Sequence, residues 1–386
     1  MRKICVITGS RAEYGLLSGL MTSIKNDNTL QLQIIATNMH LSPEFGYTYK
    51  EIEQDGFIID KKVEMLLSSD SSNGTSKSVG LAIIGFADAY EDLKPDLIVV
   101  LGDRYEILAA VTTALFYKIP VAHLHGGEIT EGAYDDSIRH AITKLSHLHF
   151  TSTEAYRKRV IQLGENPERV FYVGAIGVEN IKETKLLNKI DLENILDFSL
   201  GDKSLLVTFH PVTLEHETAK QQCENLLAVL AELEYLNIIF TLPNSDTDGR
   251  VIMQLIKDFV IRHNERSVAF TSLGKVRYLS ALQYVTAVVG NSSSGIIEVP
   301  SFRIPTLNIG DRQKGRIAAN SVIHCGTSIN EIKRGIELIL SEKIQQVAKN
   351  NVNPYQKENT TANILKVLKD FPLNNIIQKT FYNIEE

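Results

Sequence analysis

Residues 96–145, DLIVVLGDRYEILAAVTTALFYKIPVAHLHGGEITEGAYDDSIRHAITKL, decide the fold that this 386-residue chain is expected to adopt. The stretch contains two continuous apolar runs, at 97–101 and 120–124, and each is followed by charged residues, glycine and a predicted helix. Short apolar runs bounded by turn signals are typical of buried parallel strands. Because ligands of open α/β sheets bind at the carboxyl ends of such strands, we expect a functional site there.

The residues that follow these two runs are unusually rich in ionisable groups: Asp103, Arg104, His125, Glu128, Asp135 and Asp136. Five of them can exchange a proton, and Arg104 carries a permanent positive charge. Packing alone does not require so many ionisable groups. The stretch therefore indicates catalysis or ligand binding.

Composition excludes several classes of protein. The length predicts two domains, because a single hydrophobic core rarely grows to this size. A net charge of −6 argues against a surface for nucleic acid or an anionic membrane. The cysteines, at 5, 223 and 325, are odd in number and far apart, which favours a reducing cytoplasm. We expect neither a signal peptide nor a membrane span.

Strands and helices are predicted to alternate along the whole chain, which favours doubly wound parallel sheets. We expect a Rossmann-like N-terminal domain at 1–175, a second at 176–360, and a helical C-terminal segment, 361–386, that packs back on the first domain. A helix is predicted over 42–55 and another from 79 to 93, and the polar stretch 68–78 is a predicted lid or solvated loop. Further strands are expected at 3–8, 32–37, 58–63, 149–152, 170–173, 204–209, 237–241, 267–270, 287–289 and 306–308.

Two loops have features of an anion site. In TGSRAEYGLL, residues 8–17, Gly9 permits a tight turn, and Arg11 and a helix N-terminus can face an anion; an ordinary turn is the alternative. In GNSSSGIIEVP, residues 290–300, residues 291–294 would cap a helix, and NH groups and serine hydroxyls would cradle phosphate. Glu298 could accept hydrogen bonds from a ribose diol. A plain serine cap is the alternative there.

Three further features lie near predicted strand ends. NIGDRQKGR, residues 308–316, places three cations close together, and arginine suits phosphate oxygens, although a solvated surface run is the alternative. His210, in FHPVT, ends the first strand of the second domain and is expected to face the cleft. His123 and His125 are two apart and could share a face suited to a metal, but no third ligand has convincing spacing, so no metal is predicted.

Seven motifs occur in order: TGSRAEYG, GDRYE, HLHGGE, YDDSIRHAITKLSHLH, FHPVT, GNSSSGIIEVPS and NIGDRQKGR. Together they resemble the hydrolysing UDP-N-acetylglucosamine 2-epimerases of bacterial sialic-acid biosynthesis, over about residues 3–360. The sequence also resembles the epimerase half of the bifunctional animal enzyme. The resemblance implies a GT-B fold, in which two doubly wound Rossmann-like domains have the active site in the interdomain cleft, and it implies no cofactor.

The resemblance also implies residue roles. Catalysis is expected from Asp103, Asp135, His210 and a group of the HGGE region. Several family members carry Glu in place of His125, so this group is left open between His125 and Glu128. The UDP site is expected to contain Arg11, Arg104, Asn244, Ser272, Ser292, Ser293, Glu298 and Arg312, with Glu298 on the ribose.

The implied reaction converts UDP-N-acetylglucosamine (UDP-GlcNAc) and water to N-acetylmannosamine and UDP. The C2 hydrogen becomes acidic only when departure of UDP develops positive charge at C1, so elimination to a glycal would precede hydration. We expect Asp103 to remove the C2 proton, Asp135 with His125 or Glu128 to guide reprotonation, and His210 and Arg104 to stabilise the leaving group.

Two alternatives concern the substrate: a 2,4-diacetamido-trideoxy sugar, as in the legionaminic acid pathway, and a GDP carrier. Three concern the activity: a GT-B glycosyltransferase, a non-hydrolysing 2-epimerase and a non-catalytic nucleotide-sugar sensor. A homodimer or homotetramer is expected from the resemblance alone.

Overall fold

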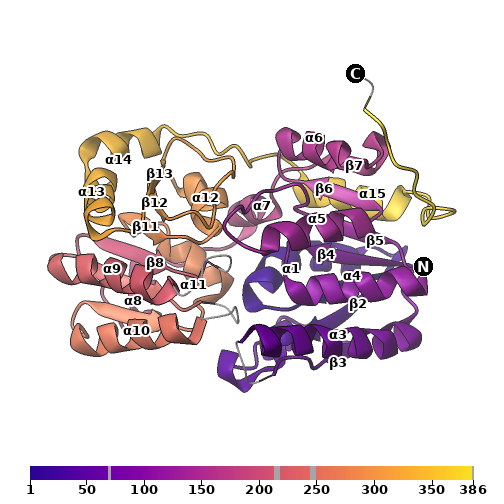
Figure 1. Cartoon of the computed structure of the whole chain (residues 1–386), viewed down its shortest axis with the longest axis horizontal. Helices are drawn as coiled ribbons and strands as arrows, with labels where there is room; N and C mark the ends of the chain where they lie inside the picture. The colour runs from indigo at the N-terminus through magenta and orange to yellow at the C-terminus, as the bar shows by residue number, and fades with distance from the viewer. Residues whose placement is uncertain (68–70, 213–217, 244–248, 385–386) are drawn as a thin grey trace. The chain divides into compact units, whose positions relative to one another are not determined.

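The computed structural model describes residues 1–67, 71–212, 218–243 and 249–384. Contacts between residues divide the chain into two units, each built on its own parallel sheet (Figure 1). Unit 1 comprises Met1–Glu128, Asp135–Asn180 and Tyr355–Glu386, and unit 2 comprises Ile129–Tyr134 and Ile181–Pro354. Among the described residues, every helix is too short or too polar to traverse a lipid bilayer.

Unit 1 contains seven parallel strands in the order β3-β2-β1-β4-β5-β6-β7, so the strand order reverses between β1 and β4. The strands are β1 (Arg2–Thr8), β2 (Leu30–Thr37), β3 (Lys61–Val63), β4 (Leu97–Leu101), β5 (Val121–Leu124), β6 (Leu148–Thr151) and β7 (Val170–Tyr172). The helices are α1 (Arg11–Asn26), α2 (Tyr49–Gln54), α3 (Ser72–Leu93), α4 (Tyr105–Tyr117), α5 (Asp135–Leu145), α6 (Glu154–Gln162), α7 (Ile176–Glu183), which continues into unit 2, and α15 (Thr360–Asp370).

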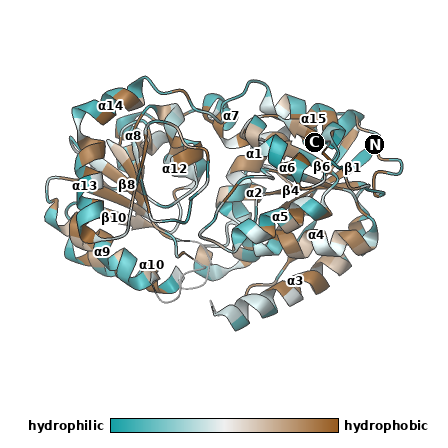
Figure 2. Cartoon of the chain, turned by 45° about the horizontal axis from the view of Figure 1, so that its top comes forward, coloured by the Kyte–Doolittle hydropathy of each residue, from teal (hydrophilic) through white to brown (hydrophobic). Residues whose placement is uncertain are grey.

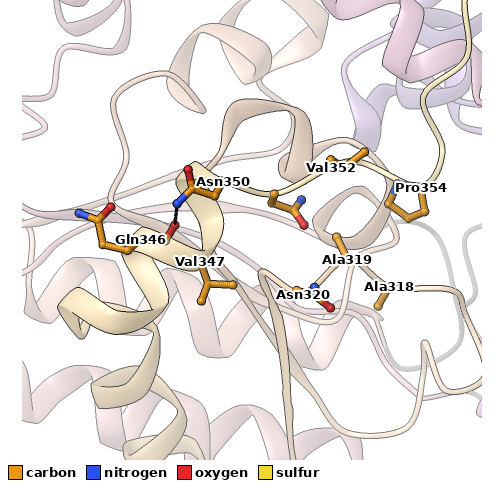
Figure 3. A pocket seen from close by; sticks show the side chains of 9 residues that line it. Ala318, Ala319, Asn320, Gln346, Val347, Asn350, Val352 and Pro354 are labelled. Carbon is orange, nitrogen blue, oxygen red and sulfur yellow. Dashed lines mark hydrogen bonds between the residues drawn. The ribbon is translucent and has the colours of Figure 1, made fainter.

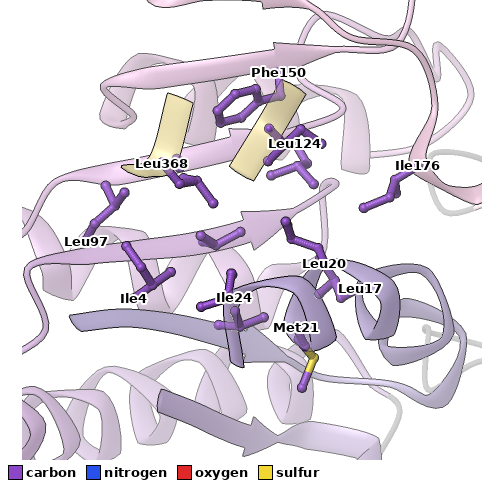
Figure 4. Close-up of a cluster of buried hydrophobic side chains, with 14 of the residues drawn as sticks. Ile4, Leu17, Leu20, Met21, Ile24, Leu97, Leu124, Phe150, Ile176 and Leu368 are labelled. Atoms are coloured by element: carbon purple, nitrogen blue, oxygen red, sulfur yellow. The ribbon is translucent and has the colours of Figure 1, made fainter. Parts of the chain in front are cut away.

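The sheet of unit 1 is buried on both faces because side chains alternate along each strand. On β1, Ile4 and Val6 pack in a cluster with α1 and α15, whereas Cys5 and Ile7 pack in a second cluster with α3 and α4. Figure 4 shows residues of the first cluster, where side chains of α1 lie beside those of the central strands. The C-terminal helix α15 thus completes the core of the N-terminal unit.

Unit 2 contains six parallel strands in the order β10-β9-β8-β11-β12-β13, with the reversal between β8 and β11. The strands are β8 (Ser204–Thr208), β9 (Asn237–Thr241), β10 (Ser267–Phe270), β11 (Ala287–Gly290), β12 (Thr306–Ile309) and β13 (Val322–Cys325). The helices are α8 (Lys189–Leu196), α9 (Ala219–Glu232), α10 (Gly249–Arg262), α11 (Gly274–Ala281), α12 (Ser294–Ile297), α13 (Ile329–Leu340) and α14 (Glu342–Lys349). Hydrophobic residues, brown in Figure 2, gather in the strands and on the inner helix faces.

Several predicted elements of unit 1 were wrong. Residues 72–78 of the predicted lid form the first turns of α3, because Ser71 caps that helix by accepting a hydrogen bond from the Gly74 amide at 3.1 Å. Residues 68–70 of the same stretch lie outside the described residues. The segment 42–55 is not one helix: a 3₁₀ turn, Pro43–Phe45, ends at the left-handed Gly46 (φ 85°), and α2 begins only at Tyr49.

The predicted C-terminal helix was too long. The observed helix, α15, ends at Asp370. Phe371 follows and precedes Pro372, and the residue that precedes a proline avoids the helical conformation. In unit 2 the sequence missed β13 altogether. Only Val322 of this edge strand is buried, so no continuous apolar run marks it.

Candidate active site

Strand order identifies one ligand-binding edge in each unit. Ligands of open parallel sheets bind at the carboxyl ends of the two strands between which the strand order reverses. In unit 1 these are β1 and β4, which are followed by Gly9 and by Asp103. In unit 2 they are β8 and β11, which are followed by His210 and by Asn291. Residues singled out from the sequence therefore lie at both reversal points.

A buried arginine, Arg139, joins several predicted catalytic residues of unit 1. Its Nη2 donates to Oδ2 of Asp103, its Nη1 donates to the His125 carbonyl at 3.0 Å, and Nη1 lies 3.8 Å from Oε2 of Glu128. The side chain is only 2% exposed, and a charge so buried requires such acceptors. Asp135 lies one turn earlier on α5, and its i,i+4 spacing puts it on the same helix face as Arg139.

His125 and Glu128 form a hydrogen-bonded pair within this cluster. Nδ1 of His125 lies 2.9 Å from Oε1 of Glu128, and the Ser152 hydroxyl donates to the same oxygen at 2.7 Å. Nε2 of His125 is buried and has no hydrogen-bond partner among the described residues. With Nδ1 held by the carboxylate, Nε2 is the ring atom that can exchange a proton with a ligand.

The backbone at His125 is strained. Its φ of 65° lies in the left-handed region, which is uncommon for a residue other than glycine and concentrates at functional sites. This conformation turns the chain directly after β5, so His125 does not share a strand face with His123. His123 bonds instead to the Gly102 carbonyl at 2.7 Å and lies 3.3 Å from the Thr143 hydroxyl, and burial lowers its pKa to about 3. The suggested shared face for a metal was therefore wrong.

Two predicted UDP ligands of unit 1, Arg104 and Arg11, each pair with a carboxylate. Nε of Arg104 donates to Oε1 of Glu106 at 2.7 Å, and Nε of Arg11 lies 2.6 Å from Oε2 of Glu51. Arg104 directly precedes α4 and Arg11 begins α1, so both cations follow the two strands of the reversal point. This arrangement can hold an anionic group at the carboxyl edge of the sheet.

In unit 2, the Asn291 side chain organises the edge. Its Oδ1 accepts from the His210 amide at 2.7 Å, and its Nδ2 donates to the His210 carbonyl at 2.8 Å. The Asn291 carbonyl accepts from Arg312 Nη1 at 3.1 Å and from Gln313 Nε2 at 3.0 Å. Asn291 is fully buried, so it fixes the backbone of His210 and the side chain of Arg312 at one place.

The serine-rich loop differs from the predicted helix cap. Helix α12 has four residues, its N-cap Ser293 makes no capping hydrogen bond, and the Asn291 side chain is used by His210. The helix therefore begins where the sequence predicted, with its N-cap at Ser293, but without a side-chain capping bond, and the phosphate cradle stays a prediction. Gly290 (φ 136°) is required, because a Cβ would collide with the backbone of Thr208.

Other predicted UDP residues have local partners. The Ser294 hydroxyl donates to Oε2 of Glu298, and the Tyr278 hydroxyl lies 2.7 Å from the Ser294 hydroxyl, which together orient Glu298. The Ser272 hydroxyl accepts from the Gly274 amide at 3.2 Å at the start of α11. Ser292 directly follows Asn291. Asn244 lies outside the described residues.

The sequence did not reveal the roles of Arg139, Ser152 or Gln313. Arg139 lies inside the deciding stretch, but its partners belong to other elements, so spacing alone gives no signal. Ser152 directly follows β6, the neighbour of β5, and strand adjacency could have identified it. Asp136, by contrast, was singled out, and it lies 3.5 Å from His140 on the same helix.

A pocket of unit 2 lies away from this edge (Figure 3). It is lined by Ala318, Ala319, Asn320, Gln346, Val347, Asn350, Asn351, Val352 and Pro354. Residues 318–320 precede β13 and so lie at the amino edge of the parallel sheet, opposite to Asn291. None of the lining side chains is charged, and the pocket therefore lacks the cations that a diphosphate requires.

A family model and curated relatives of this chain point to the same family. A family model described as UDP-N-acetylglucosamine 2-epimerase matches residues 22–369. A GDP/UDP-N,N'-diacetylbacillosamine 2-epimerase (hydrolyzing) of Campylobacter jejuni is 44% identical, over 99% of both chains. Polysialic acid biosynthesis protein P7 of Escherichia coli is 41% identical, over 100% of this chain and 98% of its own. A UDP-N,N'-diacetylbacillosamine 2-epimerase (hydrolyzing) of Legionella pneumophila is 35% identical, over 98% of both.

Solved structures agree on the fold. The crystal structure of UDP-GlcNAc 2-epimerase from Neisseria meningitidis bound to UDP-GlcNAc is similar with a TM-score of 0.79 at 20% identity, over 95% of this chain and 99% of that one. The S. aureus MnaA-UDP co-structure is similar with a TM-score of 0.80 at 18% identity, over 99% and 100% of the two chains. At these identities the likeness concerns the fold alone, which is of the GT-B type expected from the motifs.

Proposed function

Because this chain belongs to the UDP-N-acetylglucosamine 2-epimerase family, whose members act on nucleotide sugars, we propose that it hydrolyses a UDP-linked 2-acetamido sugar and inverts C2. The proposed reaction of UDP-GlcNAc gives N-acetylmannosamine and UDP. The observation that carries this proposal is the buried cluster in which Arg139 joins Asp103 to the His125–Glu128 pair. Such a cluster supplies separate groups to remove and return a proton.

The proposed first step is elimination. The C1–O bond to UDP breaks and leaves its electron pair on the diphosphate, while a base removes the C2 proton and a C1=C2 double bond forms. We assign the base to Asp103, because Arg139 orients its carboxylate and because Asp103 follows β4 at the strand reversal. General base catalysis of this kind contributes about 10²–10⁴-fold to the rate.

The proposed second step is hydration of the glycal. Water adds its oxygen to C1, a proton is delivered to C2 on the opposite face, and the surplus proton of the water passes to a protein base. We assign the proton donor to His125 through Nε2, with Asp135 as its companion. Glu128 then acts as a positioning residue, because its Oε1 already accepts hydrogen bonds from His125 and Ser152.

The leaving group is proposed to be bound by the edge of unit 2 and by the cations of unit 1. Arg312, held by the Asn291 carbonyl, would contact the diphosphate, and Glu298, held by Ser294, would accept from the ribose hydroxyls. Arg104 and His210 would neutralise the charge that develops on UDP as it leaves. The assignments of Arg11, Asn244, Ser272, Ser292 and Ser293 to the UDP site stay predictions.

A second substrate has specific support. The relatives at 44% and 35% identity are named for N,N'-diacetylbacillosamine, a sugar with a second acetamido group. We therefore propose UDP-GlcNAc as the first substrate to test and UDP-N,N'-diacetylbacillosamine as the second candidate. A nucleotide sugar with an N-acetyl group at C2 can undergo the same elimination and hydration.

Turnover of both nucleotide sugars by the purified protein tests this proposal. We expect free UDP and a free 2-epimerised sugar from at least one of them without any added acceptor, as measured by proton NMR. A UDP-linked epimer as the sole product would indicate a non-hydrolysing epimerase. Release of UDP only in the presence of an acceptor would indicate a glycosyltransferase, and binding without turnover would indicate a nucleotide-sugar sensor.

We further propose a cytoplasmic homodimer or homotetramer. Light scattering on the purified protein tests the assembly, because a monomeric mass at micromolar concentration would contradict it. Fractionation of the producing cells tests the location, and recovery outside the cytoplasm would contradict it.

A further inference from the structure

Two buried carboxyl groups of unit 1, those of Glu13 and Glu106, both lie against Gly9, the residue that follows β1. Oε2 of Glu13 accepts from the Gly9 amide at 2.6 Å, and a Cβ added to Gly9 would collide with the Glu106 carboxylate. Glu13 is 5% exposed and Glu106 is fully buried. Carboxylates are rarely buried unless they are paired, so this pair requires an explanation.

Each carboxyl group has one oxygen in use and one oxygen without a partner. Oε1 of Glu106 accepts from Nε of Arg104 at 2.7 Å, and Oε2 of Glu13 accepts from Gly9. Oε1 of Glu13 and Oε2 of Glu106 are buried and make no hydrogen bond to any described residue. A proton on Glu13 lowers the negative charge of this site.

Charge counting supports a single proton. The charged groups that act on Glu13 are Glu106 and Arg104, both at the start of α4. His40, which packs on the Gly9–Ser10 turn, is neutral because burial lowers its pKa to about 4, and Arg11 pairs with Glu51. Two ionised carboxylates beside one guanidinium would leave a net negative charge at an edge that must receive a diphosphate.

We propose that Glu13 holds a proton and that Glu13 and Glu106 together act as positioning residues for the Gly9 turn and for Arg104, so that loss of this proton weakens binding of the diphosphate. The inference rests on the proposed function for its ligand. With the proton present, the two carboxyl groups and Arg104 sum to zero charge. Without it, they sum to one negative charge, which repels the diphosphate and competes for Arg104.

The pKa of Glu13 sets the pH at which this change occurs. Burial raises it first, and the charge of Glu106 raises it further, to about 8. Because the proton stabilises the ligand-binding arrangement, the affinity for the diphosphate should be highest below about pH 8 and should fall as the pH rises through that value. UDP loses its own phosphate proton near pH 6, well below this range.

Calorimetric titration with UDP, from about pH 6 to about pH 10, tests the proposal on the full-length protein. We expect the dissociation constant of the unmodified protein to rise about tenfold per pH unit above about pH 8. Glu13→Gln, which imitates the protonated group, should bind UDP within about threefold of the unmodified protein below pH 8 and should lose the alkaline rise. Glu106→Gln should also lose the alkaline rise, because ionised Glu13 and Arg104 then sum to zero charge.

Glu53→Gln is the matched control, because it removes a carboxylate that pairs with Lys62 on the surface of the same unit. In this variant the dissociation constant of UDP should still rise at alkaline pH. In steady-state assays below pH 8, kcat of Glu13→Gln should be unchanged within about threefold, since Asp103 and His125 are untouched. If Glu106→Gln fails to fold, Glu13→Gln alone remains decisive, and its thermal melting should match that of the unmodified protein.

Infrared difference spectroscopy with isotope-labelled glutamate reports the proton without any ligand. We expect a protonated carboxyl band at neutral pH that disappears above about pH 8 and is missing from Glu13→Gln. An unmodified protein without this band, or a Glu13→Gln variant that keeps the alkaline rise, would overturn the proposal. Failure of UDP to bind at any pH would instead overturn the proposed function, and the infrared band would still test the proton on Glu13.

Discussion

Nδ1 of His125 lies 2.9 Å from Oε1 of Glu128, and both side chains are buried. The sequence left the second acid or base open between these two residues, and the structure shows that they are hydrogen-bonded to each other. Glu128 also accepts from Ser152, and the Nε2 atom of His125 has no partner among the described residues. The geometry therefore supports His125 as the group that moves the proton and Glu128 as the group that orients it.

Replacing each member of this pair separates the two roles. We expect His125→Asn to lower kcat about 10³-fold and Glu128→Gln to lower it about 10²-fold, with KM within about threefold in both. The difference follows because Gln still offers an oxygen to His125. Steady-state kinetics measure it, and a smaller loss for His125→Asn than for Glu128→Gln would reverse the assignment.

Asp103→Asn tests the proposed base. The carboxamide keeps the shape of the side chain but cannot take the C2 proton, so turnover should fall at least about 10³-fold while UDP affinity stays within about threefold. Because Arg139 loses a charged partner, a stability loss of roughly 3 kcal/mol should accompany it, measured by denaturant unfolding. Asp92→Asn, which affects a surface ion pair with Lys61, is the control for both measurements. Loss of UDP binding in Asp103→Asn would make Asp103 a ligand contact.

Asn291→Ala tests the organisation of the edge of unit 2. Its side chain makes two hydrogen bonds to the backbone of His210, so truncation should loosen His210 and Arg312 together. We expect the dissociation constant of UDP to rise about tenfold, the size of one or two lost hydrogen bonds. Isothermal titration with UDP checks this, and Asn225→Ala, on the helix α9, is a control that should leave affinity unchanged. Normal UDP affinity in Asn291→Ala would contradict the assignment.

A buried ion network in unit 1 predicts how stability depends on pH. Although burial alone would raise the pKa of Glu165, the hydrogen bonds from His149, Lys144 and Lys379 lower it to about 2, against an ordinary value of 4.5. A carboxyl whose folded pKa is depressed stabilises the fold above its unfolded pKa and loses that contribution as the pH falls. The stabilisation, about 3 kcal/mol, should therefore be complete above about pH 5 and should vanish toward pH 2.

Urea unfolding of the unmodified protein and of Glu165→Gln measures this contribution. The free energies of unfolding should differ by about 3 kcal/mol at neutral pH, and the difference should shrink between about pH 5 and about pH 2. A difference that stays constant over this range would show that Glu165 acts through packing and not through its charge.

The sequence predicted most strands because a buried parallel strand is usually marked by a short run of mainly apolar residues, and β9 and β10 have the expected bounds. It failed where a polar segment is helical, as at 72–78, and where an edge strand is half exposed, as at Val322–Cys325. At 72–78, a serine cap starts the helix in spite of the polar sequence. The edge strand β13 lacks the apolar run that marks a buried strand.

Only part of the candidate site could be predicted from the sequence, for a different reason. Asp103, His125 and Glu128 were named because they follow predicted strands, but the partner that joins them, Arg139, comes from the middle of helix α5. Glu13 and Glu106 each read as an ordinary helix residue, since their proximity depends on the adjacency of β1 and β4. Contacts across strands cannot be obtained from spacing along the chain.

Turnover in heavy water tests the central claim most directly, because elimination and hydration must exchange the C2 hydrogen with solvent. The account predicts free N-acetylmannosamine, or its diacetamido counterpart, with one deuterium at C2 in every product molecule, as read by proton NMR. A free epimerised sugar that retains its original C2 hydrogen would contradict the account.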